Sequence, residues 1–288
     1  MDPAIFLIQV LNGLQYGLLL FLVASGLTLI FGIMGIINLA HGSFYMIGAY
    51  LAFSLTRQVG NFWLALAAGV VVALLLGIAL EWLVMRFLYE RDHLYQVLLT
   101  YGLILVFEEV RSLVWGDDVH GVPVPPALDF SIPLTDTLSY QVYRLAMSAI
   151  CLAIAFAMYW LIQRTRLGMM IRAGSVNRDM AQSLGINIGL LYRLVFALGL
   201  ALAALAGMLA APISSVYPGM GNQVLIISFV VVVIGGIGSV KGALIAALAI
   251  GLADTFGKVL LPQIAGMVTY LLMAAVLLWR PRGIFGRA

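Results

Sequence analysis

Residues 4–31 read AIFLIQVLNGLQYGLLLFLVASGLTLIF, a continuous apolar stretch without a charged side chain. A helix needs about 20 apolar residues to cross the hydrocarbon layer of a bilayer, so this stretch predicts a first membrane span. The rest of the chain has the same character, because apolar residues make up 64% of it and charged residues only 9%, with a mean hydropathy of +1.10. Soluble domains carry about 25% charged residues. The sequence therefore predicts an all-α, polytopic transmembrane helix bundle.

The chain has room for little besides membrane spans. Its 288 residues accommodate roughly eight to ten helices of membrane length, so residues 1–288 are predicted to form one membrane domain. We expect about eight to nine spans, and some windows are candidates for broken or re-entrant helices. The apolar windows fall at about 4–31, 38–56, 62–85, 96–115, 139–162, 188–211, 223–240, 242–260 and 264–280.

The distribution of charge orients these windows. Arginine is concentrated in 163–187 and in the C-terminal tail, whereas 116–138 has aspartates and prolines but no lysine or arginine. Because basic residues collect on the cytoplasmic side, 163–187 is predicted to be a cytoplasmic loop and 116–138 an external, extended loop. Nine crossings then give an external N-terminus and a cytoplasmic C-terminus. The charges are Arg164, Arg166, Arg172, Arg178, Arg280, Arg282 and Arg287, against Asp117, Asp118, Asp129 and Asp136.

Glycine and small polar residues interrupt the apolar pattern at two places, residues 32–48 (the first break) and 235–242 (the second break). Glycine costs about 1 kcal/mol relative to alanine inside a helix, so such clusters indicate bends or unwound turns. Paired breaks in two halves of a transporter indicate a substrate path, and close helix packing is the alternative explanation. The candidate path residues are Asn38, His41, Gly42, Ser43, Gly48, Gly235, Gly236 and Gly238.

Ionisable residues are sparse within the windows. His41 lacks a second histidine or a cysteine nearby, so we expect a hydrogen-bonded structural histidine and no metal site. Glu108 with Arg111, and Asp254 with Lys258, have spacings of three and four residues that allow pairing on one helix face. No carboxylate falls clearly at the middle of a span, which disfavours coupling to a proton or sodium gradient.

Residues 171–192, IRAGSVNRDMAQSLGINIGLLY, form the most polar insert between apolar windows. Ser175 as N-cap and Gly185 as the C-terminal stop predict a short helix, with Arg172 just before it. Val176, Met180 and Leu184 recur every four residues and predict an apolar stripe, which needs a surface to lie on because so short a helix is marginal in water. The membrane interface is one candidate surface. The mixed polar face of Asn177, Asp179, Gln182 and Ser183 favours a protein groove.

A family resemblance follows from these segments. Asp179 to Gly185 resembles the EAA-x-x-x-G cytoplasmic loop of bacterial ABC importer permeases, with Met180 in place of an alanine and Ala181 at the next position. The stretches NLAHGSFYMIGAY (38–50), VVVIGGIGSVKGALIAA (231–247) and RPRGIFG (280–286) resemble the LivH-type permeases of branched-chain amino acid ABC importers. The resemblance spans nearly the whole chain.

The resemblance implies a set of partners. They are a LivM-type permease, two cytoplasmic ATPase subunits of LivG/LivF type, and a periplasmic substrate-binding protein, in the lipid of a bacterial inner membrane and without nucleic acid. By the same resemblance, residues 175–185 act as the helix that couples to an ATPase. The chain has no G-x-x-x-x-G-K-[ST] motif, so we expect no enzymatic activity here and no cofactor in this chain, with ATP and Mg²⁺ bound by partner subunits.

The predicted function is therefore a transmembrane permease subunit of an ATP-driven importer for branched-chain or other hydrophobic amino acids, working by alternating access. A path with few fixed charges suits a net-neutral solute. Urea or short amides remain an alternative substrate class for the same machine. An ion-coupled secondary transporter or channel is the alternative from another class, and it leaves the 171–192 segment unexplained.

Overall fold

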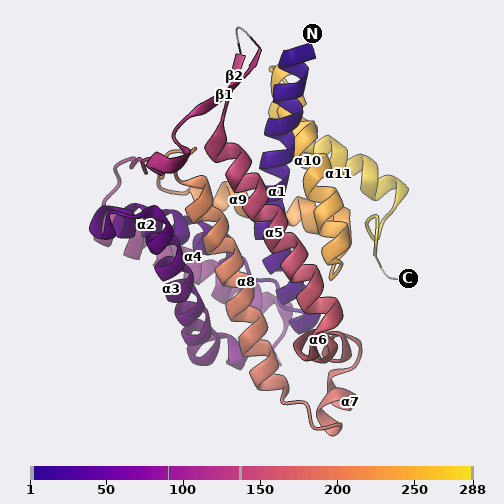
Figure 1. Ribbon diagram of the computed structural model, residues 1–288. Coiled ribbons are helices and arrows are strands. Elements are labelled where there is room, and N and C mark those ends of the chain that lie inside the picture. Colours follow the sequence, from indigo (N-terminus) through magenta and orange to yellow (C-terminus); the bar gives the residue numbers. More distant parts are fainter. Residues whose placement is uncertain (1–2, 90, 136–137, 287–288) are drawn as a thin grey trace.

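The computed structural model describes residues 3–89, 91–135 and 138–286, and helices dominate it (Figure 1). Asp136 and Arg287 of the predicted loop and tail lie outside the described residues. The elements are α1 (Pro3–Met34), α2 (His41–Val59), α3 (Phe62–Leu83), η1 (Met85–Leu88), α4 (His93–Trp115), η2 (Pro126–Leu128), β1 (Ser131–Thr135), β2 (Leu138–Gln141), α5 (Val142–Arg164), α6 (Arg166–Val176), α7 (Arg178–Ser183), α8 (Ile188–Ala210), α9 (Met220–Gly235), α10 (Val240–Leu260) and α11 (Ala265–Trp279).

Five helices in the described part of the chain are long and apolar enough to cross a membrane: α1, α3, α5, α8 and α10. Helices α9 and α11 are apolar but have only 16 and 15 residues. The windows at 38–56 and 96–115 also form helices, α2 and α4, which do not belong to the five. The all-α membrane bundle is thus confirmed, whereas eight to nine crossings and the orientation of the termini stay predictions.

Helix α1 packs against α5, α8, α9 and α10 inside the bundle (Figure 1). Its long apolar sequence fits this position, because 89% of its most apolar window is buried within the chain itself. Small residues let the antiparallel α10 approach closely. A Cβ added to Gly17 would lie 2.9 Å from the Cα of Leu248, and one added to Gly13 would lie 3.0 Å from the Cα of Leu252. At Gly13 and Gly17 the glycines therefore serve close helix packing.

Helix α2 begins deep inside the bundle instead of at its edge. The chain leaves α1 at Met34 and runs without helix to His41, whose Nε2 lies 2.9 Å from the carbonyl oxygen of Val23. Val23 precedes the end of α1 by eleven residues, which corresponds to about 16 Å along the helix axis at 1.5 Å per residue. The segment between α1 and α2 therefore folds back alongside α1, as expected for a broken helix.

Helix α9 begins beside the start of α2. A Cβ added to Gly221 would lie 2.5 Å from the carbonyl oxygen of Gly42, so the first turns of the two helices are in backbone contact. From there α9 leads to a tight turn at residues 236–239 and into α10. Helices α2 and α9 thus start next to each other in the interior. The first break leads into the start of α2, and the second break begins at the end of α9.

The loop predicted to be external, residues 116–138, ends in a β-hairpin whose second strand continues into the predicted window at 139–162. Strands β1 and β2 pair antiparallel, with Ile132 opposite Tyr140 and Pro133 opposite Ser139, after a single 3-10 turn that starts at Pro126. The prolines do exclude an α-helix, as expected, but the segment is a hairpin and not only an extended loop. Figure 1 shows this hairpin at one end of the molecule and α7 at the opposite end.

Candidate functional site

The segment from α6 to Ile188, residues 166–187 (the α6–α7 segment), consists of two short helices where one had been expected. Helix α6 continues to Val176, and α7 starts at Arg178 with Asn177 as its N-cap, because the Oδ1 of Asn177 accepts a hydrogen bond from the backbone N–H of Met180 at 2.9 Å. The assignment of Ser175 as N-cap was wrong. Ser175 lies in the last turn of α6, where its hydroxyl donates to the carbonyl oxygen of Arg172.

Helix α6 is fixed to the end of α5. Arg172 donates to the carbonyl oxygen of Ile162, and Gly168 lies against the same part of the α5 backbone, where a Cβ would collide with carbonyl oxygens. Ile171 is buried, as is Gly174. These contacts attach α6 to the end of α5.

Helix α7 presents apolar side chains to the outside. Val176 is 75% exposed, Met180 59% and Leu184 77%, whereas Ala181 is buried and its carbonyl oxygen accepts the backbone N–H of Ile186. Gly185 follows α7 with a φ of +88°, a left-handed conformation that favours glycine, and ends the helix as expected. Asp179, in the first turn of α7, lies 3.9 Å from Arg178 and is almost fully exposed. The three residues of the predicted stripe (the exposed stripe, or α7 stripe) are uncovered within the described chain, but they do not lie on one helix, because Val176 ends α6, Met180 lies in α7 and Leu184 follows α7.

The polar residues of the first break are buried. Asn38 and His41 are 0% exposed and Ser43 is 4% exposed. Asn38 accepts the backbone N–H of Ala40 through Oδ1, and its carbonyl oxygen accepts the N–H of His41. The expectation that His41 is hydrogen-bonded is confirmed by its contact with Val23, its structural role stays a prediction, and its Nδ1 has no hydrogen-bond partner in the described residues. Gly48 packs on α8, because a Cβ there would lie 2.6 Å from the Cα of Ala204.

The second break is a turn closed by the C-terminal tail. Gly236 and Gly238 have φ values of +93° and +77°, and Gly235 packs against Gly242 across the turn. The backbone N–H groups of Ile284 and Phe285 donate to the carbonyl oxygens of Ile234 and Gly235 at the end of α9. The tail motif noticed in the sequence therefore supplies hydrogen-bond donors for carbonyl groups that a helix end leaves free.

The two breaks meet. A Cβ added to Gly32 would lie 2.6 Å from the Cα of Gly238. Next to this contact is a cavity of about 480 Å³, which also reaches the α6–α7 segment. Its lining residues are Thr28, Leu29, Phe31, Gly32, Ile33, Tyr159, Ile162, Gln163, Ile171, Arg172, Ser175, Ile237, Gly238, Ser239, Val240, Lys241 and Phe285. Among the predicted site residues, the structure thus brings Arg172, Ser175 and Gly238 together, while Asn38, His41, Gly42, Ser43 and Gly48 lie elsewhere in the interior.

Comparisons with known proteins show what this chain is similar to. Residues 9–277 match the family described as branched-chain amino acid transport system / permease component. The chain is 32% identical to the high-affinity branched-chain amino acid transport system permease protein BraD of Pseudomonas aeruginosa, over 98% of this chain and 96% of BraD. It is 31% identical to the permease protein LivH of Escherichia coli, with the same coverage. A probable LivH of Methanocaldococcus jannaschii is 27% identical over 94% of this chain and 90% of that protein.

The chain belongs to this permease family. The recognition made from the three sequence stretches and the 179–185 segment is confirmed, and with it the permease role. The match to the family covers both breaks, the α6–α7 segment and the residues that line the cavity, except Phe285 of the tail, because the match runs from residue 9 to residue 277.

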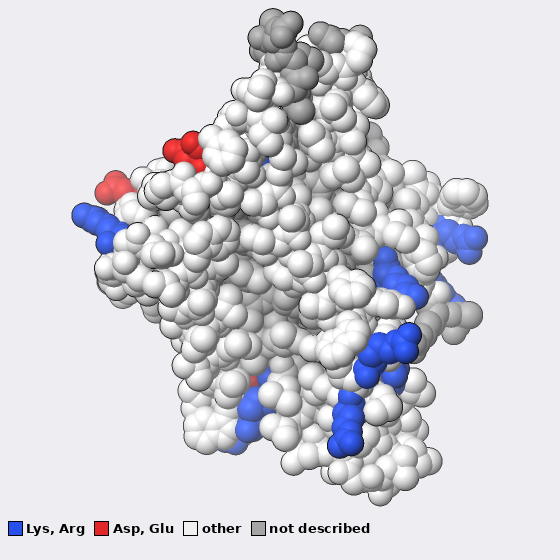
Figure 2. Space-filling model, in the orientation of Figure 1, with Lys and Arg blue, Asp and Glu red and all other residues white. Residues whose placement is uncertain are grey.

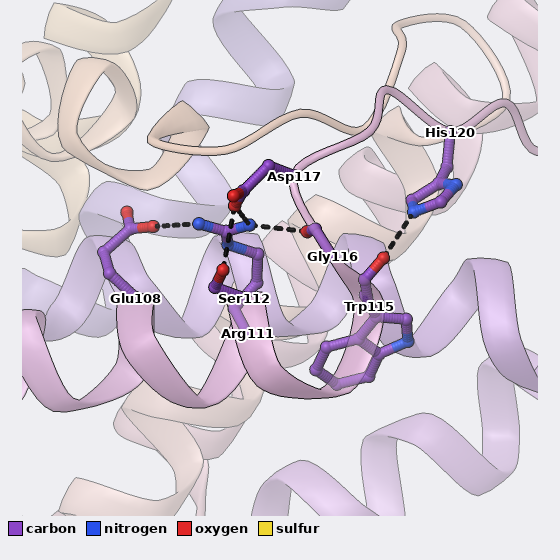
Figure 3. Close-up of polar contacts among 7 residues, drawn as sticks. All are labelled: Glu108, Arg111, Ser112, Trp115, Gly116, Asp117 and His120. Atoms are coloured by element: carbon purple, nitrogen blue, oxygen red, sulfur yellow. Dashed lines mark hydrogen bonds and ion pairs between the residues drawn. The ribbon is translucent and has the colours of Figure 1, made fainter.

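Charged side chains of this permease form local pairs. Arg111 is 6% exposed and lies 3.4 Å from Glu108 and 2.7 Å from Asp117, and it also donates to the carbonyl oxygen of Gly116 (Figure 3). Hydrogen bonds from Arg111 and Ser112 lower the pKa of the exposed Asp117 carboxyl below its ordinary value. The cluster closes the end of α4 and compensates the buried guanidinium. It thereby resembles a structural ion pair more than a proton carrier.

Of two further ion pairs, one was predicted from the sequence and the other was not. Lys258 and Asp254 lie 2.6 Å apart, as their spacing predicted. Glu81, 1% exposed at its side chain, binds Arg193 at 2.8 Å and accepts a hydrogen bond from Tyr89. Arg193 is separated from Glu81 by 112 residues, so no local spacing could have indicated this pair.

Proposed function

We propose that this chain is the transmembrane subunit of an ATP-driven importer for branched-chain or other hydrophobic amino acids. It works by alternating access, and separate ATPase subunits hydrolyse ATP with Mg²⁺. The observation that carries the proposal is the α6–α7 segment, which is attached to α5 yet leaves Val176, Met180 and Leu184 uncovered. A short amphipathic helix of this kind fits a groove in a partner protein.

The segment is suited to transmit force. In the proposal, α7 sits on an ATPase of LivG/LivF type, and movement passes through Arg172 to α5 and to the cavity at the two breaks. The predicted path residues, from Asn38 to Gly238, then line or support a passage that opens alternately to either side. A LivM-type permease and a periplasmic binding protein complete the assembly in a bacterial inner membrane.

Orientation is part of the proposal. We place α7 and the C-terminus in the cytoplasm and the N-terminus and hairpin outside, with α2, α4, α9 and α11 added to the five long spans. The lysine and arginine side chains supply the support: on the face seen in Figure 2 they gather mostly near α6, the lower end of α10 and the C-terminal end. Basic residues favour the cytoplasmic side. Tagging the two termini for protease protection in vesicles tests this placement.

Asp179→Arg tests the coupling role in a reconstituted importer. The Asp179 side chain is exposed, and its one ion pair among the described residues is a long contact to Arg178, so the chain should still insert and fold. Reversing a charge at a protein interface costs several kcal/mol, so we expect transport per ATP hydrolysed to fall roughly tenfold or more. The matched control is Asp92→Arg, an exposed aspartate at the start of α4, which should leave this ratio unchanged. Unaltered coupling in Asp179→Arg would remove this role from the residue.

The path is tested separately. We expect Asn38→Leu and Ser43→Trp to abolish flux while the complex with the ATPases still assembles, because both side chains are buried at the first break. Normal flux in these variants would mean that the path lies elsewhere.

The energy source and the substrate are tested by uptake. Uptake driven by an ion gradient into vesicles that hold only this chain would contradict the ATP-driven proposal. Competition of labelled leucine uptake by urea or acetamide decides between amino acids and short amides.

A further inference from the structure

The cavity beside the two breaks is lined by positive charge without a matching negative charge. Arg172 and Lys241 both line it, and its lining contains no aspartate or glutamate. Within the described residues neither cation forms an ion pair with a carboxylate. Lys241 instead lies with its Nζ 5.4 Å from the centre of the Tyr159 ring. Two cations that share one cavity without a counterion create a site for an anion.

Other polar groups of the cavity favour the same sign of ligand. Helix α10 starts at Val240 with Ser239 as N-cap, so the positive end of its dipole points towards the lining. The hydroxyl of Thr28 also belongs to the lining, is buried, and has no hydrogen-bond partner in the part of the chain that the structure describes. A helix N-terminus, two cations and a free hydroxyl together match the oxygens of a phosphate group.

The rim of the cavity is apolar and exposed. Tyr159 is 44% exposed, Ile237 54% and Phe285 44%. Phe156 and Leu152 precede Tyr159 by three and seven residues on α5, which places them on the same helix face, and they are 70% and 58% exposed. A basic cavity therefore continues into an apolar track along a membrane helix.

We propose that this cavity binds the phosphate of an anionic phospholipid, with the acyl chains lying along α5. Basic pockets between membrane helices on the cytoplasmic side are known places for such headgroups. A zwitterionic amino acid fits less well, because its ammonium group would meet two cations and no carboxylate. The inference rests on the orientation proposed above, which sets Arg172 and Lys241 at the cytoplasmic leaflet. Since Arg172 and Ser175 belong to α6, a bound lipid also holds the α6–α7 segment in place.

Lipid exchange into the purified importer, measured by native mass spectrometry, tests the proposal. We expect phosphatidylglycerol from nanodiscs to bind in preference to phosphatidylcholine. Lys241→Gln should weaken phosphatidylglycerol binding about fivefold, the effect of removing one charge near the membrane surface, and Lys241→Arg should retain it. Lys258→Gln is the matched control. Lys258 is the other lysine of the chain, it is held by Asp254 at 2.6 Å, and its loss should change nothing.

Further measurements distinguish a lipid phosphate from a soluble phosphate, and a second variant replaces Lys241→Gln if that variant misfolds. Inorganic phosphate or glycerol phosphate that displaces the lipid at millimolar concentration would overturn the lipid proposal in favour of a soluble anion. Equal binding of both lipids, or equal loss in Lys241→Gln and Lys258→Gln, would overturn the site. If Lys241→Gln fails to fold, Thr28→Val removes one hydroxyl at constant shape and should also weaken binding. No transport is measured, so failure here leaves the proposed function intact, whereas failure of the proposed orientation in the protease-protection test would remove the cytoplasmic placement on which the lipid site rests.

Discussion

The first break and helix α7 are opposites in how they treat their side chains. The first break buries Asn38 and His41 completely in a chain that is 64% apolar, whereas α7 and its flanks leave Val176 and Leu184 more than 70% exposed. Buried polar groups cost free energy unless they are hydrogen-bonded, and exposed apolar stripes indicate a missing partner. The break finds hydrogen-bond partners within the chain for the Asn38 Oδ1 and the His41 Nε2, although the Asn38 Nδ2 and the His41 Nδ1 have none in the described residues. The α7 stripe does not find a cover in the described chain, so its partner is expected to be another molecule.

Glycine substitution gives the largest expected contrast between the two regions. A Cβ at Gly42 would lie 2.7 Å from the Cβ of Leu225 and collide with the backbone of Gly221, whereas a Cβ at Gly185 meets nothing within 4 Å. We expect Gly42→Ala to lower the free energy of unfolding by about 3 kcal/mol through overpacking. Gly185→Ala should cost only about 1 kcal/mol, because its φ of +88° is strained for alanine. Thermal unfolding of the purified chain in one detergent measures both.

Substitution by asparagine distinguishes the two causes of destabilisation, which are crowding at Gly42 and backbone strain at Gly185. It tolerates left-handed backbone better than alanine does, so Gly185→Asn should be milder than Gly185→Ala. At Gly42 the limit is space, so Gly42→Asn should be worse than Gly42→Ala. If asparagine ranked the same way at both positions, the distinction between a crowded helix contact and a free turn would be lost.

The two asparagines give the next contrast, because they perform the same task in different surroundings. Asn38 accepts the N–H of Ala40 at 3.1 Å while buried, and Asn177 accepts the N–H of Met180 at 2.9 Å while exposed. Asn38→Ala leaves a buried N–H without its acceptor and should cost about 2 kcal/mol. Asn177→Ala loses a helix cap that water can replace in part, which should cost about 1 kcal/mol. The same unfolding experiment applies.

The ranking of aspartate against alanine should reverse between the two positions, with aspartate milder than alanine at Asn177 and worse than alanine at Asn38. Asn177→Asp keeps a good cap at the start of α7 and is expected to be neutral. Asn38→Asp keeps the acceptor but places a carboxylate in a fully buried site, so it should destabilise more than Asn38→Ala. Equal tolerance of aspartate at both positions would show that water reaches Asn38, and it would bring the first break closer to an open path.

The sequence could predict what depends on near neighbours along the chain. Apolar windows located the helices, because membrane-length apolar runs have few other structures available. Spacings of three and four residues predicted the Glu108 and Lys258 pairs, and a lone histidine in a break predicted a hydrogen-bonded one. The N-cap was misplaced by two residues, since serine and asparagine both cap helices. Burial of Ile171 and Gly174 extends α6 past Ser175 and leaves the cap to Asn177.

Features assembled from distant segments were out of reach. The Glu81 and Arg193 pair joins α3 to α8, and the cavity draws its lining from α1, α5, α6, the α9–α10 turn and the tail. The sequence marked both breaks but gave no sign that Gly32 touches Gly238. The number of membrane crossings is hard to predict from the sequence for a similar reason. Whether α2 and α4 cross the membrane depends on which neighbouring helices cover their polar residues, and the mean hydropathy of a window does not include those neighbours.

Loss of the exposed stripe should have the smallest effect on stability and a large effect on assembly. Leu184 is 77% exposed, so Leu184→Ser should change the free energy of unfolding by less than about 0.5 kcal/mol. If the stripe docks on an ATPase, the same variant should retain less ATPase during co-purification, and Leu184→Met should retain it. Substantial destabilisation would mean that the chain itself covers Leu184. Undiminished ATPase retention together with normal stability would mean that the stripe lies on the membrane surface. The first break would then still be covered by the chain itself, but the cover of the α7 stripe would be lipid instead of a partner protein.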